Sequence, residues 1–372
     1  MMQFTQTDRE YMSMAISLAQ KGFNTTTPNP NVGCVIVKEG EIVGQGFHIQ
    51  AGGPHAEVFA LREAGAHARG ATAYVTLEPC SHYGRTPPCA KGLIDAGVSK
   101  VICAMVDPNP EVAGNGLRML QQAGIEVASG LLEHEARLLN KGFLKRMEHD
   151  LPYVTAKLAA SLDGKTALKN GKSKWITGPH ARQDVQAYRA QSCAILSGAD
   201  TVLTDDARLN VRNESVSEVS SRLNDDDIRQ PVRVIIDSQN RLTPSLSLFK
   251  CESKIIILRS KLDNEHVWPH FVEQVCLPTV KNKLDLNAAM QFLASRNINS
   301  VWLEAGATLC GVMHEQGLID EYIVYLAPKI IGEGGKGLFQ SNILTEMDQV
   351  SELQITDCTQ IGTDIRISAI KK

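Results

Sequence analysis

Short apolar runs and amphipathic stretches alternate along the first half of the chain. Behind a capping box of Thr7 and Glu10, four apolar residues recur at helical spacing: Tyr11, Met14, Ala15 and Leu18. Apolar runs bounded by turn residues predict strands at 32–37, 42–46, 73–77, 101–106 and 125–127. Helix-forming segments lie at 56–65, 89–96, 117–123 and 133–146. A helix, a hairpin and then alternating helices and strands predict a three-layer α/β/α sandwich.

A second pattern begins after the polar stretch 147–152, which ends in Pro152 and is typical of a linker. Strands are predicted at 153–159, 194–197, 232–236, 254–258, 274–277, 301–304 and 322–326. Helices are predicted at 285–296 and from a cap at Thr177 or Gly178 to Ala190. Residues 213–229, rich in Ser, Asn, Asp and Glu, are interpreted as an exposed insertion. We therefore expect two α/β domains, at 1–148 and 152–372.

Composition narrows the function classes. The 372 residues carry a net charge of -3, so no overall basicity attracts nucleic acid or anionic membranes. No apolar run approaches the ~18 residues of a membrane helix, and Asp8, Arg9 and Glu10 interrupt the N-terminus before a signal peptide could form. Nine cysteines, an odd number without a C-x-x-C pair, favour reduced thiols and a cytoplasmic location.

One constellation in the first half has the composition of a metal site. His55, Cys80 and Cys89 offer an imidazole and two thiolates to zinc and leave a fourth position open for water, which is typical of a catalytic site. Glu57 follows His55 by two residues and is the expected general acid/base of a zinc deaminase motif, H-x-E followed by P-C-x-x-C. Here eight residues, not two, separate the cysteines. A structural zinc site or scattered core residues would leave Glu57 unexplained.

A glycine-rich turn in the second half is a candidate phosphate site. Residues 306–311 follow a predicted strand and open a helix, whose N-terminus presents backbone N–H groups to an anion. Their glycine spacing fits neither a dinucleotide fingerprint nor a Walker loop. Taken alone, a tight strand-to-helix turn is the commoner explanation. The second glycine-rich loop, 332–337, lacks a Ser or Thr after Lys336 and is not treated as a site.

Four motifs closely resemble the bifunctional deaminase/reductase family of riboflavin biosynthesis. They are residues 28–33 (PNPNVG), 55–57 (HAE), 76–89 (TLEPCSHYGRTPPC) and 107–110 (DPNP). The long cysteine spacing is that family's own variant, and the resemblance covers nearly the whole chain. It implies a cytidine-deaminase-like N-terminal domain and a dihydrofolate-reductase-like C-terminal domain. It also implies one zinc ion per chain, NADPH, phosphoribosyl pyrimidine substrates and a homo-oligomer, either a dimer or a tetramer.

The resemblance also implies roles for individual residues. In the first half, five positions are expected to hold the pyrimidine, ribose and phosphate: Asn29, His48, Arg85, Asp107 and Asn109. In the second half, the expected substrate contacts are Lys157, Ser173, Arg189, Leu209, Arg212 and Glu304. The expected cofactor contacts are Ala159, Trp175, Thr201, Asp205, Ser238, Gly306, Ala307, Thr308, Leu309, Cys310, Gly311 and Val312. From the residues themselves, Arg189 and Arg212 are sensible phosphate clamps, and the alternative that either is an ordinary surface arginine stays open. Asp237 and Ser238 end a predicted strand, a common place for an adenosine-ribose contact, so we hypothesise that Ser238 with Arg241 selects the 2′-phosphate.

Two other function classes compete with a bifunctional biosynthetic enzyme. A zinc deaminase of nucleic acid or of nucleotides, with an appended binding domain, would need a basic groove or an aromatic stacking surface. The net charge of -3 and the 5% aromatic content disfavour this alternative. A non-catalytic, zinc-stabilised binding protein would have no use for Glu57 beside a three-ligand site.

Overall fold

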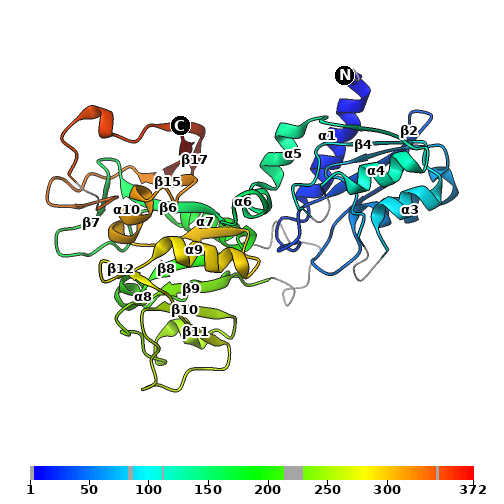
Figure 1. Cartoon of the computed structure of the whole chain (residues 1–372). Coiled ribbons are helices and arrows are strands. Elements are labelled where there is room, and N and C mark those ends of the chain that lie inside the picture. The colour runs from blue at the N-terminus through cyan, green and yellow to red at the C-terminus, as the bar shows by residue number, and fades with distance from the viewer. Residues whose placement is uncertain (1–3, 83–86, 111–112, 213–228, 341–342) are drawn as a thin grey trace. The chain divides into compact units, whose positions relative to one another are not determined.

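The computed structural model describes residues 4–82, 87–110, 113–212, 229–340 and 343–372. The chain divides into two compact units between Asp150 and Leu151, and Figure 1 colours the first in blue to green-cyan and the second in green to red. The predicted insertion at 213–229 lies outside the described residues except for Arg229, which donates to the Ala190 and Ser192 carbonyls. No helix in the described ranges combines the length and the apolar character that crossing a bilayer requires.

Unit 1 is built on a five-stranded mixed sheet in the order β2-β1-β3-β4-β5. β1 pairs antiparallel with β2 and β3, whereas β3, β4 and β5 run parallel. Its strands are β1 (Gly33–Lys38), β2 (Glu41–Phe47), β3 (Thr72–Val75), β4 (Lys100–Cys103) and β5 (Glu126–Ser129). Its helices are α1 (Gln6–Gln20), α2 (Ala56–Ala64), η1 (Gly65–Ala68), α3 (Cys89–Ala96), α4 (Asn115–Gln122), α5 (Glu133–Leu139) and α6 (Lys141–His149).

Helices cover both faces of this sheet. Because side chains alternate along a strand, Ile36 of β1 packs on the face covered by α2, α3 and α4, while Val35 packs on the face covered by α1, α5 and α6. Small residues let α2 approach closely, since Ala56, Ala60 and Ala64 are all buried. The predicted three-layer sandwich is confirmed.

Two local predictions in unit 1 are wrong. The capping box of α1 joins Thr5 and Asp8, not Thr7 and Glu10: Thr5 N–H donates to Asp8 Oδ2 at 2.8 Å. The helix expected over 133–146 is broken at Asn140. The backbone of Asn140 is not helical there, with a φ of -122°, and its side chain binds Asn31. The Asn140 Oδ1 accepts from Asn31 N–H at 2.8 Å and its Nδ2 donates to the Asn31 carbonyl at 2.9 Å.

The close approach of α2 to β2 supplies a stability prediction. A Cβ at Gly46 would lie 2.5 Å from the Ala56 carbonyl oxygen, so Gly46→Ala is expected to lower the unfolding free energy of unit 1 by about 1–3 kcal/mol. Urea unfolding of the full chain measures this change. The control is Gly92→Ala on α3, where a Cβ meets only Leu61 at an ordinary 3.6 Å. Equal stability of the two variants would contradict the packing argument.

Unit 2 is built on a nine-stranded sheet in the order β11-β10-β9-β8-β14-β6-β15-β18-β17. The strands from β11 to β15 run parallel, and the antiparallel pair β18 and β17 closes one side. Its strands are β6 (Tyr153–Ser161), β8 (Ala194–Gly198), β9 (Val232–Ile236), β10 (Ile255–Arg259), β11 (Val272–Cys276), β14 (Ser300–Leu303), β15 (Glu321–Ala327), β17 (Leu353–Ile361) and β18 (Asp364–Lys371). Two short pairs stand apart: β7 (Lys165–Ala167) with β16 (Lys336–Gly337), and β12 (Thr279–Val280) with β13 (Lys283–Leu284).

The parallel part of this sheet is covered on both faces. The helices are α7 (Pro179–Gln191), α8 (Ala199–Asp205), η4 (Ser247–Lys250), α9 (Leu286–Ser295), α10 (Ala307–Glu315) and η5 (Met347–Gln349). Residues of α9 and α10 pack on one face, and residues of α7, α8 and η4 pack on the other. Two residues, Thr177 and Gly178, were candidates for the N-cap of α7. The N-cap is Gly178, and Pro179 takes the first helical position. The C-terminal hairpin was not among the predicted elements.

Candidate active sites

The three predicted zinc ligands of unit 1 lie together. His55 caps the N-terminus of α2, Cys89 is the first residue of α3, and Cys80 follows β3. The His55 Nδ1 lies 3.6 Å from Cys80 Sγ and 3.3 Å from Cys89 Sγ, and all three atoms lie within 4.8 Å of one another. Zinc bonds of about 2.3 Å to sulfur and about 2.0 Å to nitrogen place tetrahedral ligands about 3.5 Å apart. The donor set therefore fits one zinc ion.

Glu57 lies beside these ligands in the first turn of α2. Its side chain is buried, and burial raises the pKa of its carboxyl group. Among the residues that the structure describes, its Oε2 has no hydrogen-bond partner. A buried carboxylate oxygen without a partner is costly, so this atom is available to a bound water or substrate. Glu57 is thus placed for proton transfer.

His48 and Asn29 line the same region. The ring of His48 meets that of His55 edge-on, with centroids 5.4 Å apart. The Pro54 carbonyl, 2.9 Å from His48 Nδ1, can only accept, so Nδ1 carries the proton. The His48 Nε2 then accepts from the Asn29 amide at 3.0 Å. Burial lowers the pKa of His48, so this pair presents a neutral, ordered polar surface next to the metal ligands.

Glu78 organises the loop that carries Asp107 and Asn109, a role that sequence reasoning missed. Its buried carboxylate accepts from four backbone N–H groups, those of Asp107, Gly114, Gly116 and Leu117, at 2.8 to 3.3 Å. Asp107 in turn accepts from Asn109 N–H at 2.9 Å. Burial raises the pKa of Asp107 to about 6. An acidic residue directly before a Pro-Cys metal motif was the available signal.

The structure therefore brings most of the predicted deaminase residues to one region. Asn29, His48 and His55 are joined by ring and hydrogen-bond contacts, Glu57 follows His55 in the first turn of α2, and Glu78 links the Cys80 segment to Asp107. Arg85, predicted to bind phosphate, lies outside the described residues.

The second site lies at the carboxyl edge of the parallel strands in unit 2. The pairing of Leu303 with Ala156 places Glu304, just after β14, level with Lys157 of β6. The Glu304 N–H donates to the Leu196 carbonyl of β8, and Ser197 Oγ donates to the Glu304 carbonyl at 2.6 Å. The neighbouring strand β8 thus fixes the Glu304 backbone from both its N–H and its carbonyl, at the edge where open α/β sheets bind ligands.

Glu304 and Arg189 form a buried, bidentate ion pair. The Arg189 Nε and Nη2 lie 2.5 and 2.8 Å from the two Glu304 carboxylate oxygens, and Nη1 donates to the Asn210 carbonyl at 2.9 Å. The Trp302 indole N–H donates to Glu304 Oε1 at 2.8 Å. Burial alone would raise the pKa of Glu304, but the Arg189 charge and hydrogen bonds lower it to about 2. Arg189 is predicted to bind phosphate. In the structure its guanidinium binds Glu304 and the carbonyl of Asn210, in the loop before Arg212.

Lys157 is the second cation of this cluster. Burial lowers the pKa of its ammonium group, while the Glu304 charge raises it. Leu209 is buried with a left-handed φ of 51°, which turns the chain between α8 and Arg212. Arg212 is exposed, and its backbone N–H donates to Gln186 Oε1 at 3.0 Å. Lys157, Arg189 and Glu304 therefore form the charged core of the site, with net charge +1 when ionised.

The predicted cofactor residues lie along the same edge. Thr201 and Asp205 are one turn apart on α8, which follows β8 directly, and Ser238 follows β9. The Lys174 ammonium donates to the Asp205 carbonyl at 3.3 Å, which ties the segment carrying Ser173 and Trp175 to α8. Trp175 is 65% exposed, with the Arg182 guanidinium 4.6 Å from its ring centroid. An exposed tryptophan at this edge can cover a planar ligand.

The glycine turn at 306–312 fits a phosphate. Gly306 caps α10, and a Cβ there would meet no atom within 4 Å, so the helix N-terminus is open. Gly311 instead lies against the chain, where a Cβ would come 2.2 Å from the Gln340 carbonyl oxygen. Ala159 of β6 packs against the cluster formed with α7 and α8. The edge therefore offers a helix N-terminus, hydroxyl groups and an aromatic ring, as a dinucleotide requires.

Comparison with known proteins gives a consistent result for both units. Residues 5–105 match the family described as the cytidine and deoxycytidylate deaminase zinc-binding region, and residues 152–367 match the RibD C-terminal domain. The riboflavin biosynthesis protein RibD of Haemophilus influenzae is 52% identical over 373 residues, covering all of both chains. The RibD of Escherichia coli is also 52% identical, covering 96% of this chain and 98% of its own.

Solved structures agree along the whole chain. A RibD structure from Acinetobacter baumannii superposes with a TM-score of 0.89 at 44% identity, covering 99% of each chain. A diaminohydroxyphosphoribosylaminopyrimidine deaminase/5-amino-6-(5-phosphoribosylamino)uracil reductase from Thermotoga maritima superposes with a TM-score of 0.85 at 33% identity, covering 98% of this chain and 99% of its own.

Proposed function

This chain belongs to the RibD family of bifunctional riboflavin-biosynthesis deaminase/reductases, and on that premise we propose how its two units divide the work. Residues 1–148 deaminate 2,5-diamino-6-(5-phosphoribosylamino)pyrimidin-4-one with zinc. Residues 152–372 then reduce the ribosyl group of 5-amino-6-(5-phosphoribosylamino)uracil to ribityl with NADPH. The observation that carries the first assignment is the buried Glu57 Oε2, which has no hydrogen-bond partner among the described residues, beside His55, Cys80 and Cys89.

In the deamination, water replaces the exocyclic amine of a ring carbon, which leaves a carbonyl and ammonia. His55, Cys80 and Cys89 would hold the zinc ion, which when bound would lower the pKa of water at the open position. Glu57 accepts a proton from the attacking water and delivers a proton to the departing amine. Asn29, His48, Asp107 and Asn109 orient the pyrimidine and ribose. Arg85, between the two cysteines in sequence, pairs with the substrate phosphate.

In the reduction, hydride adds to C1′ of the opened ribose. NADPH, when bound, would supply that hydride. Lys157 lies level with Glu304 on the neighbouring strand, and its burial favours release of a proton. Arg212 and Lys157 face the substrate phosphate and sugar, while Arg189 and Glu304 hold the loop of Leu209 in place. Ser173 completes the substrate contacts, and the predicted cofactor residues bind NADPH along the strand ends.

The two activities can be tested together. Purified protein mixed with NADPH and the diaminopyrimidine substrate should release ammonia and consume NADPH, which is followed by absorbance. If NADPH is not consumed even when the deaminated intermediate is supplied, the assignment of the reductase to residues 152–372 fails.

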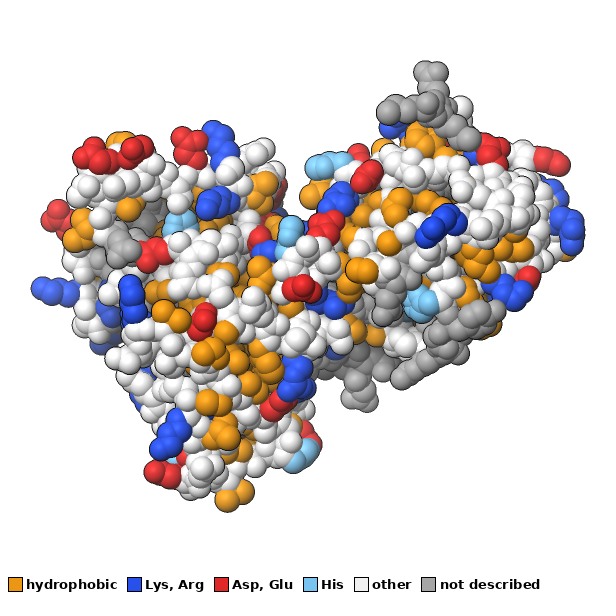
Figure 2. Space-filling view, in the orientation of Figure 1, with side chains coloured by type: hydrophobic (Ala, Val, Ile, Leu, Met, Phe, Trp, Pro, Cys, Tyr) orange, Lys and Arg blue, Asp and Glu red, His pale blue; other side chains and the backbone are white. Residues whose placement is uncertain are grey.

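A nucleic-acid deaminase is disfavoured because Lys, Arg, Asp and Glu side chains are interspersed on the face drawn in Figure 2, where no continuous basic stripe is visible.

Metal removal separates the two units functionally. After chelation we expect ammonia release to fall to background, because the three ligands no longer hold the ion on which water activation depends. Reduction of the deaminated intermediate should continue, since its proposed residues all lie after Leu151. The two rates are measured on the same chelated sample, and one equivalent of zinc should restore ammonia release. Parallel loss of both activities would contradict the division of labour.

We also propose that the protein forms a homodimer in the cytosol, where its nine free cysteines stay reduced. β17 is the last strand of the large sheet, and its side chains are largely exposed, Ile355 to 63%. Met347, just before it, is 83% exposed. A long edge strand with exposed apolar side chains is a template for pairing with another chain.

The dimer is tested at that strand. Ile355→Glu is expected to shift the mass measured by light scattering from dimer to monomer, because a buried carboxylate would oppose the contact. Val267→Glu, at a site that is 92% exposed outside the sheet, serves as the control and should leave the mass unchanged. A dimer that survives Ile355→Glu would place the interface elsewhere.

A further inference from the structure

An exposed ion pair bridges two strand ends on the proposed cofactor edge of unit 2. Arg241 Nη1 lies 2.6 Å from Asp200 Oδ1. Asp200 follows β8 and Arg241 follows β9. These two strands are neighbours and pair in parallel as far as Gly198 and Ile236. The pair therefore spans the carboxyl ends of two adjacent strands, where open α/β sheets bind ligands. Both side chains are accessible, at 41% for Arg241 and 80% for Asp200.

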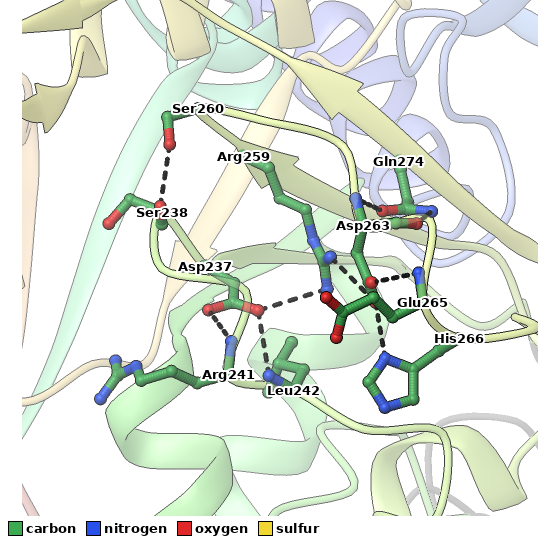
Figure 3. Close-up of polar contacts among 10 residues, drawn as sticks. All are labelled: Asp237, Ser238, Arg241, Leu242, Arg259, Ser260, Asp263, Glu265, His266 and Gln274. Carbon is green, nitrogen blue, oxygen red and sulfur yellow. Dashed lines mark hydrogen bonds and ion pairs between the residues drawn. The ribbon is translucent and has the colours of Figure 1, made fainter.

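The backbone of Arg241 is held by a buried carboxylate. Figure 3 shows Asp237 reaching back into its own loop, where Oδ1 accepts from Arg241 N–H at 3.0 Å and Oδ2 accepts from Leu242 N–H at 3.1 Å. In the same view the Arg241 side chain extends away from Asp237. One end of this arginine is thus anchored in the core while its guanidinium stays in solvent.

Asp237 is itself fixed by a buried arginine. Arg259, at the end of β10, lies 3.3 Å from Asp237 Oδ2 and 3.4 Å from Asp263 Oδ2, and all three side chains are almost fully buried. The Trp268 ring lies 4.9 Å from the Arg259 guanidinium, and Ser260 Oγ donates to the Ser238 carbonyl at 2.8 Å. Buried ion pairs add little net stability. Here they fix the loop from Ser238 to Arg241 against β10.

The chemistry of the pair matches the one position at which NADPH and NADH differ. An arginine binds a phosphate through charge-assisted hydrogen bonds, and a carboxylate at a strand end accepts from a ribose 2′-hydroxyl. Arg241 therefore suits the 2′-phosphate of NADPH, and Asp200 suits the 2′-hydroxyl of NADH. While the ion pair is formed, Arg241 is not free to bind a phosphate and Asp200 is not free to accept from a hydroxyl.

We propose that Arg241 selects NADPH by exchanging Asp200 for the 2′-phosphate, and that Asp200 is its partner when no cofactor is bound. This inference rests on the proposed NADPH-dependent reduction in residues 152–372. An exposed ion pair contributes little to stability because water screens both charges, so a phosphate can displace Asp200. The anchored backbone of Arg241 means that only its side chain has to move.

The test compares two nucleotides that differ only in the 2′-phosphate, adenosine 2′,5′-bisphosphate and 5′-AMP. Their affinities for the full-length protein are measured by calorimetry without substrate, and the NADPH-to-NADH ratio of kcat/KM is measured in parallel. The variants are Arg241→Gln and Asp200→Asn. The control is Arg296→Gln, because the Arg296 side chain is as exposed as that of Arg241, at 41%, and also pairs with a carboxylate, that of Glu273, but follows α9, before β14 begins.

Arg241→Gln is expected to weaken the bisphosphate by about 10- to 100-fold, to leave 5′-AMP unchanged and to lower the NADPH-to-NADH ratio similarly. Asp200→Asn should tighten the bisphosphate by about 2- to 5-fold and weaken turnover with NADH. Two results would overturn the inference and leave the reductase intact. One is a bisphosphate affinity that Arg241→Gln does not change. The other is a wild type that consumes NADPH but binds the bisphosphate and 5′-AMP equally well. Absence of both nucleotide binding and NADPH consumption would remove the proposed function as well.

Discussion

Replacing Glu57 with Gln is expected to lower the rate of ammonia release by about 10²- to 10⁴-fold, the usual contribution of general acid/base catalysis. The amide cannot take the proton of the attacking water, although it has nearly the same shape as the carboxylate. Because His55, Cys80 and Cys89 are unchanged, the variant should still bind one zinc ion. Ammonia release and zinc content are measured on the same preparation, together with reduction of the deaminated intermediate, which should be unaffected.

Glu63→Gln is the matched control for this prediction. Glu63 is on the same helix, and its Oε2 accepts from Gln45 N–H at 2.9 Å, a bond that a glutamine oxygen can also accept. Normal ammonia release in Glu63→Gln would show that α2 tolerates the change of charge. Retained activity in Glu57→Gln would exclude proton transfer by this residue, and loss of zinc with loss of activity would assign it a structural role.

Replacing Glu304 with Gln is expected to lower the unfolding free energy of unit 2 by about 3–5 kcal/mol, because it leaves the Arg189 guanidinium buried without a counter-charge. Reduction of the deaminated intermediate should fall with it, since the Leu209 loop loses its anchor. Urea unfolding and NADPH consumption measure the two effects. The double variant Glu304→Gln with Arg189→Met should recover much of the stability but not the activity.

The same pair predicts a dependence on pH. The pKa of Glu304 lies at about 2, below its ordinary value of 4.5. Its contribution to stability is therefore complete above about pH 4.5 and is lost as the pH falls toward 2. The wild type should lose stability over this interval more steeply than the Glu304→Gln variant does. Parallel curves for the two proteins would contradict the assigned ion pair.

Sequence reasoning succeeds where residues act through local spacing. The three predicted zinc ligands sit at the starts of two helices and after one strand, and their side chains lie together as the motif and the predicted elements required. The cytidine-deaminase-like and dihydrofolate-reductase-like folds expected from the resemblance are confirmed. The α3 helix has the predicted bounds because a Pro-Pro pair precedes Cys89 and Gly97 ends it with a left-handed φ of 71°.

Distant contacts account for what was not predicted. Arg189 was expected to bind phosphate, and only the folded sheet brings it to Glu304, 115 residues later. Asn140 was read as part of a continuous helix, but its bonds to Asn31 interrupt that helix. The box of Thr7 and Glu10 satisfied the spacing rule as well as Thr5 and Asp8 did, and the helix begins at the earlier pair. Pattern alone does not rank such alternatives.

The hydrogen bonds between Asn31 and Asn140 show that the segment carrying the proposed deaminase chemistry is shorter than the segment that has to fold. All three proposed zinc ligands lie within residues 5–105, the span that matches the deaminase zinc-binding region. A chain cut there would lack β5, which pairs with β4, and α5 and α6, whose Ala136 and Phe143 cover one face of the sheet. The loop of Asn29 would also lose its anchor at Asn31. Residues 106–149 therefore contribute to the deaminase site through the Asn31–Asn140 hydrogen bonds and the packing of α5 and α6, although they supply none of the proposed zinc ligands.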